Sequence, residues 1–219
     1  MCFSATASFV TGAVLFAGGV AAVKFSENSR QLPFAMIPFI FSFQQIIEGV
    51  LWLSLSLPEF SGWKSTSMYA YLIIAQVVWP TWVPFSIYTN EKIKKRKRIL
   101  RILLIIGVLV SAALGYGLFT YPLDAVIRNY HIGYFLDVPS QYRIIPGIFY
   151  FIPTIFPAFI SSVKYMRSFG IAILISFLAT KIFYPENVIS VWCYFAAIMA
   201  FSVILILKNQ AKIPQKISV

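Results

Sequence analysis

The sequence consists mainly of apolar runs of about twenty residues, separated by short polar segments. A run of this length forms a helix that crosses the hydrocarbon core of a bilayer, whereas a transmembrane β-strand needs only about 9–11 alternating residues. Only 11% of the residues are charged, against roughly 25% in a soluble domain. We therefore predict an all-α, polytopic transmembrane helix bundle that forms a single domain over residues 1–219. The seven predicted spans are 3–23, 32–57, 66–89, 99–119, 144–163, 169–184 and 188–207.

The basic residues divide unevenly between the two sides of this predicted bundle. With the N-terminus outside, fourteen of the 18 Lys and Arg residues lie on the inner side, seven of them between Lys92 and Arg101. Because Lys and Arg accumulate in cytoplasmic loops, we expect an outside N-terminus and a cytoplasmic C-terminus, in a prokaryotic cytoplasmic membrane. The basic run at 92–101 would then meet anionic lipid. Nucleic-acid binding is not expected, because no base-stacking or groove-reading module accompanies the run.

The second predicted span carries an unusual polar stripe in the stretch FSFQQIIEGVLW, residues 41–52. Gln44 and Glu48 are one helical turn apart, and Trp52 continues the same face. A carboxylate at the centre of a membrane helix costs on the order of 2.5–3.5 kcal/mol, so Glu48 should face protein, a ligand or water. We predict a polar pocket in the outer half of the membrane that binds or conducts a small ligand or proton. Its expected residues are Gln44, Gln45, Glu48, Trp52, Gln76 and Trp79.

The predicted topology brings a second group of polar residues to the same outer side, namely Cys2, His131, Lys181 and Cys193. Glu48 could simply pair with Lys181 or with the neighbouring amides and lock the helices together. Cys2, His131 and Cys193 are also admissible metal ligands, although no HExxH or CxxC spacing supports a metal site, and no cofactor is assigned. A disulfide between the two cysteines is another option on an oxidising face.

A membrane enzyme is the alternative to a ligand or proton pocket. If Met1 is removed, Cys2 becomes the first residue, and an N-terminal cysteine can act as a nucleophile with its own amine as the base. A metal held by cysteine, histidine and Glu48 at the outer face would be a second route to catalysis.

Small residues and prolines suggest close contacts between helices. Gly107, Ser111 and Gly115 recur at four-residue spacing, which is typical of tightly packed membrane helices. We expect this face to pack within the chain, with a homo-oligomer or a partner subunit as the alternative, in which case the protein would be a non-catalytic accessory subunit. Pro80 and Pro84 each remove a backbone donor from the third span, and the freed carbonyls can line a cavity.

Several of these stretches together resemble one family of small, uncharacterised multi-spanning membrane proteins. They are the opening MCFSATASF, QQIIEG in the second span, the WP pair at 79–80, HIGY at 131–134 and VWCYFAA in the last span. The resemblance runs along most of the chain and implies a shared helical membrane fold. It implies no activity. The matching positions are Cys2, Phe3, Ser4, Gln44, Gln45, Glu48, Gly49, Trp79, Pro80, His131, Tyr134, Trp192 and Cys193.

Overall fold

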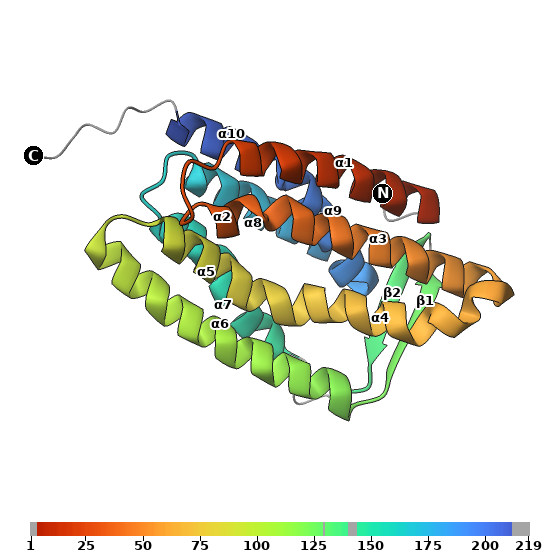
Figure 1. Ribbon diagram of the computed structural model, residues 1–219. Coiled ribbons are helices and arrows are strands. Elements are labelled where there is room, and N and C mark those ends of the chain that lie inside the picture. Colours follow the sequence, from red (N-terminus) through yellow and green to blue (C-terminus); the bar gives the residue numbers. More distant parts are fainter. Residues whose placement is uncertain (1–3, 129, 140–143, 212–219) are drawn as a thin grey trace, which may run out of the picture.

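The chain folds into a bundle of long helices with a β-hairpin at one end (Figure 1). The structure is a computed structural model that describes residues 4–128, 130–139 and 144–211. The first half contains α1 (Ala5–Lys24), α2 (Leu32–Ala35), α3 (Ile37–Ser56), η1 (Pro58–Trp63), α4 (Lys64–Leu72), η2 (Ile73–Val78), α5 (Trp79–Asn90) and α6 (Lys94–Thr120). The second half contains β1 (Leu123–Arg128), β2 (His131–Leu136), α7 (Ile144–Ile160), α8 (Met166–Phe183), η4 (Pro185–Asn187), α9 (Val188–Met199) and α10 (Phe201–Ala211).

The helices agree with the predicted membrane bundle. Within the described residues, six helical segments are long and apolar enough to cross a membrane, and the shorter α7 supplies the seventh helix at the predicted place. α1 begins at the hairpin end of the bundle and α10 ends at the opposite end (Figure 1). Which end faces the cytoplasm remains a prediction from the basic residues.

The third span is interrupted by a π-helix, η2, between α4 and α5. In a π-helix the carbonyl of residue i bonds the N–H of residue i+5, so the carbonyl of Ala75 would need a donor at position 80. That position is Pro80, which has no N–H. The hydroxyl of Tyr150 on α7 donates to the Ala75 carbonyl instead, at 2.7 Å. A side chain from another helix thus satisfies the carbonyl that the proline leaves open.

The small-residue face of α6 packs against this interrupted span. Pro84 cannot donate to the carbonyl of Pro80, which faces Gly107 so closely that a Cβ at Gly107 would overlap the Pro80 oxygen. One turn further on, the Ser111 hydroxyl donates to the carbonyl of Val77 at 2.6 Å. The expected packing of this face within the chain is therefore observed, and the face is already covered by η2 and α5.

The connection after α6 forms an antiparallel β-hairpin, which the sequence pattern does not indicate. Arg128 pairs with His131 and Ala125 with Tyr134, and Tyr130 in the turn has a positive φ of 61°. Ala125 and Ile132 are buried against the ends of α3 and α4. The hairpin therefore closes one end of the helix bundle.

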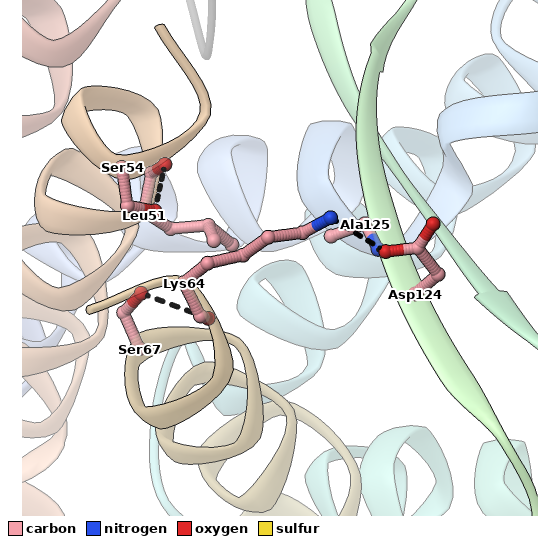
Figure 2. Close-up of polar contacts among 6 residues, drawn as sticks. All are labelled: Leu51, Ser54, Lys64, Ser67, Asp124 and Ala125. Carbon is pink, nitrogen blue, oxygen red and sulfur yellow. Dashed lines mark hydrogen bonds and ion pairs between the residues drawn. The ribbon is translucent and has the colours of Figure 1, made fainter. Parts of the chain in front are cut away.

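An ion pair fastens the hairpin to the start of α4 (Figure 2). Lys64 Nζ lies 2.7 Å from Asp124 Oδ1, which also accepts the backbone N–H of Ala125 at 2.8 Å. The Lys64 ammonium group holds the pKa of Asp124 below its usual value. Both side chains are more than a third exposed, at 37% and 59%. Such an exposed ion pair contributes only about 0–1 kcal/mol to stability. Burial of Ala125 and Ile132 therefore holds the hairpin in place more than the ion pair does.

At the opposite end, Glu91 links two loops. It follows α5, is almost fully buried, and its carboxylate accepts the backbone N–H and the hydroxyl of Ser162 at 2.7 and 2.6 Å. The same carboxylate accepts the N–H groups of Lys92 and Ile93, the two residues just before α6. Burial raises the pKa of Glu91, but these four hydrogen bonds together outweigh it and leave the pKa below its ordinary value. The contact joins the connection between α5 and α6 to the connection between α7 and α8.

Replacing Glu91 with alanine is expected to lower the free energy of unfolding by about 1–3 kcal/mol at pH 7, because several buried donors lose a charged acceptor. Since folding lowers the pKa of Glu91, its contribution is complete above the unfolded-state value of about 4.3 and is lost as the pH falls through the folded-state value. Thermal unfolding of the wild type and Glu91→Ala should therefore differ at pH 7 and converge at acidic pH. Glu59→Ala, at an exposed acidic position, is the matched control.

Candidate functional site

The centre of the candidate site is Glu48, which is fully buried on α3. Its Oε1 accepts a hydrogen bond of 2.6 Å from the hydroxyl of Ser190 on α9, and its Oε2 lies 3.4 Å from Nε2 of Gln45. Ser190 itself has no exposed surface. The carboxyl group of Glu48 therefore joins two helices in the interior of the bundle, at a place that bulk water does not reach.

One turn away, Gln44 is held by the indole of Trp79. Gln44 is fully buried, and its Oε1 accepts the N–H of Trp79 on α5 at 2.9 Å. The Trp79 ring also stacks on Phe41, with ring centroids 4.1 Å apart. Phe41, Gln44 and Glu48 follow helical spacing and so share one face of α3. The predicted association of Gln44, Glu48 and Trp79 in one region is observed.

Cys193 extends the polar region along α9. It lies three residues after Ser190, so both side chains face the same side of that helix. Cys193 is a buried free thiol, and Gln44, Tyr71 and Glu48 all lie within electrostatic reach of it. Tyr71, on α4, is fully buried and stacks on Tyr134 of the hairpin. Through this contact, the hairpin covers the polar residues around Cys193 at one end of the bundle.

We name the group Gln44, Gln45, Glu48, Trp79, Ser190 and Cys193 the polar core. One of its buried atoms, Oε1 of Gln45, has no hydrogen-bond partner among the described residues. The same is true of the indole nitrogen of Trp52, one turn beyond Glu48. A buried polar atom without a partner costs about 1–3 kcal/mol, so each needs a physical explanation such as water or a ligand.

Other predicted site residues lie apart from the polar core. Gln76 is only half-buried on the π-helix, and Lys181 is exposed on α8, so Lys181 does not pair with the buried Glu48. The amides and Ser190 take the role that the pairing hypothesis gave to Lys181. His131 is buried at the start of β2 with its ring 5.0 Å from that of Tyr184. Burial holds the pKa of His131 below its usual value.

The metal and nucleophile hypotheses depend on Cys2, which lies outside the described residues. Within the described part of the chain, no three His, Cys, Asp or Glu residues gather as metal ligands. Sequence reasoning missed Ser190 and Tyr150. Ser190 could have been found from its helical spacing to Cys193, whereas nothing in the sequence links Tyr150 to the carbonyl of Ala75.

An apolar cavity of about 60 Å³ adjoins the polar core and shares Trp79 and Cys193 with it. We name it the aromatic cavity. Phe34, Phe41 and Ile87 form part of its fully buried wall, while Tyr150 and Trp192 are only partly buried. Polar and apolar surfaces therefore meet at Trp79 and Cys193, in the middle of the bundle.

The chain belongs to a family whose model matches residues 1–218 and is described as "Family of unknown function (DUF6629)". The resemblance to an uncharacterised family, which rested on the MCFSATASF opening and the other motifs, is thereby confirmed. No curated protein and no solved structure matches the chain. The family assignment brings no activity.

Proposed function

We propose that this protein is an integral membrane protein that binds a proton or a small polar ligand at Glu48 and can pass it through the bundle. The observation that supports this most is the full burial of Glu48 in a hydrogen-bonded group drawn from α3 and α9. A carboxyl group inside a membrane bundle is costly to keep and is commonly part of an ion or proton pathway. Glu48 is the acidic member of the polar core.

The surroundings of Glu48 provide groups that a proton or small ligand would need. The Ser190 hydroxyl can donate to a carboxylate and accept from a carboxylic acid, so it suits both protonation states of Glu48. Gln45 supplies a buried acceptor, its Oε1, that is not used by the described residues. Short π-helical segments inside α-helices, such as the neighbouring η2, frequently occur at functional sites.

The proposal is tested with protein in liposomes that contain a pH-sensitive dye, with a potassium diffusion potential driving proton entry. Wild-type protein is expected to acidify the lumen faster than protein-free liposomes, and Glu48→Gln is expected to return the rate to that of protein-free liposomes. Glutamine keeps the size of the side chain but cannot release a proton. Glu59→Gln, at an exposed site, should retain the wild-type rate.

Infrared spectroscopy tests proton binding without requiring flux. A carbonyl band that titrates with pH in the wild type and disappears in Glu48→Gln would assign proton uptake to Glu48. Equal proton flux in the wild type and Glu48→Gln would reject conduction through Glu48. Absence of any band that depends on Glu48 over the whole accessible pH range would reject proton binding there.

A further inference from the structure

Positive charge gathers at the end of the bundle opposite the hairpin. Seven Lys and Arg residues lie between Lys92 and Arg101, in the loop before α6 and in the first turns of that helix. Lys24 and Lys208 lie in the last turns of α1 and α10, which end on the same side of the molecule (Figure 1). This end therefore presents a strongly basic surface, of the kind that attracts anionic lipid headgroups.

Acidic side chains do not neutralise this surface. Within the described part of the chain, the one ion pair joins Lys64 and Asp124 and lies at the hairpin end instead. Glu91 stands next to the basic run, but its carboxylate is buried and accepts hydrogen bonds from Ser162 and from the backbone. The positive charge of the basic run is therefore available to an anion from outside the chain.

Two members of the basic run converge on Tyr88 of α5. Lys97 Nζ lies 4.8 Å from the centroid of the Tyr88 ring, and Arg101 Nη2 lies 3.5 Å from the Tyr88 hydroxyl oxygen. The second contact is at the outer limit of a hydrogen bond, so the guanidinium of Arg101 keeps donors for another acceptor. Arg96, in contrast, donates to the carbonyl of Ser161 at 2.8 Å. Tyr88 thus holds two cationic groups close together without neutralising either.

The face of α6 that carries these two cations continues as an apolar surface. Four residues at helical spacings of three or four share this face, namely Lys97, Arg101, Ile105 and Val108. Ile105 is 55% exposed and Val108 is 49% exposed. On a helix that crosses a membrane, such exposed aliphatic side chains meet acyl chains. One side of α6 therefore passes from two cations to an apolar strip, in the same order as the headgroup and the acyl chain of a phospholipid.

We propose that Tyr88, Lys97 and Arg101 bind the phosphate group of an anionic phospholipid, whose acyl chain lies along Ile105 and Val108. The guanidinium of Arg101 can bind two phosphate oxygens at once, and Lys97 adds a second positive charge. The Tyr88 hydroxyl adds a donor, and tyrosine is enriched at the level of the headgroups. The sequence predicts anionic lipid along the whole basic run, whereas the contacts to Tyr88 single out one site within it.

The test compares two lipids with identical acyl chains, dioleoylphosphatidylglycerol and dioleoylphosphatidylcholine. Purified full-length protein in detergent is titrated with each lipid, and bound lipid is counted by native mass spectrometry. Each basic residue near the membrane surface favours an anionic lipid by about fivefold, so the first phosphatidylglycerol should bind about twenty-fivefold more tightly than phosphatidylcholine. Equal affinities for the two lipids would overturn the proposal.

Two double variants separate a defined site from a diffuse basic surface. Lys97→Gln combined with Arg101→Gln should lower the affinity for phosphatidylglycerol to that for phosphatidylcholine. Lys92→Gln combined with Lys95→Gln removes the same charge from exposed positions nearby and should change that affinity less than twofold. Lys95 is two residues from Lys97 and so does not share its face. Equal losses in the two double variants would show that charge alone attracts the lipid and would overturn the site.

A soluble competitor tests whether the apolar strip contributes. Glycerophosphoglycerol is the phosphatidylglycerol headgroup without acyl chains, and an excess of it should leave the bound lipid in place. Displacement would show that the cations hold any phosphate ester and would overturn the assignment to lipid.

Thermal unfolding in detergent reports whether each variant is folded. If the double variant at Lys97 and Arg101 does not fold, Arg101→Gln alone decides, with an expected loss of about fivefold. Wild-type affinity in Arg101→Gln would overturn the site. None of these measurements involves Glu48, so the inference stands or falls separately from the proposed function.

Discussion

Gly107→Ala is expected to lower the free energy of unfolding by about 3 kcal/mol, because the added methyl group overlaps the backbone carbonyl of Pro80. A flexible side chain could move aside, but this oxygen belongs to a backbone that is held by two further contacts. Ser111 binds the Val77 carbonyl and also lies 2.9 Å from the hydroxyl of Thr81. Relief of the overlap therefore requires α5 and α6 to separate. Thermal unfolding in detergent measures the loss.

Gly117→Ala is the matched control on the same helix. A Cβ at Gly117 would meet nothing within 4 Å, so the alanine should be neutral or add up to about 1 kcal/mol through its better helix propensity. Gly115→Ala should lie between the two, since its nearest neighbour is a side-chain carbon of Val77 at 3.6 Å. A Gly107→Ala variant as stable as Gly117→Ala would show that the two helices do not approach each other as described.

Trp79→Ala should destabilise the protein by about 3–5 kcal/mol, the usual cost of removing a large buried aromatic side chain. Trp79 is 5% exposed, stacks on Phe41 and forms part of the wall of the aromatic cavity. Trp79→Phe keeps most of the ring contact but leaves Oε1 of Gln44 without its donor, so a smaller loss of about 1–3 kcal/mol is expected. Both losses are measured as changes in unfolding midpoint and free energy.

A double-mutant cycle isolates the hydrogen bond between Trp79 and Gln44. Once Gln44 is replaced by leucine, Trp79→Phe should cost less than it does in the wild type, because no amide oxygen remains to be left unpaired. Purely additive effects of the two substitutions would contradict the bond. Trp63→Ala is the control for loss of a tryptophan, and its 58% exposure predicts a change within about 0.5 kcal/mol.

The polar stripe on α3 could be predicted because residues three or four positions apart in a regular helix lie on the same face. Gln44, Glu48 and Trp52 follow the helical repeat, and the structure places all three in the buried interior. Gln76 was predicted beside them and lies only half-buried. It belongs to the π-helix, where the regular relation between spacing and direction no longer holds, and the bond from Tyr150 that helps to shape this segment comes from a distant helix.

Lys181 and Ser190 show a second reason why the predicted and the observed partners of Glu48 differ. Topology placed Lys181 at the same end of the bundle as Glu48, but it could not define the rotation of α8 about its own axis. Packing turns Lys181 outward, while α9 directs Ser190 to Glu48. The hairpin was missed for a related reason. Each of its strands is only six residues long. The strands depend on burial of Ala125 and Ile132 against α3 and α4, which are distant in the sequence.

The sequence by itself determined the number and positions of the membrane helices and the presence of one costly carboxyl group within them. Bilayer thickness and the low polarity of its core impose both features on any chain of this pattern. Only the tertiary structure decided which polar groups meet Glu48, which carbonyls the prolines leave open, and where the aromatic cavity lies. These depend on helix rotation and close packing, which arise from contacts between residues far apart in the chain.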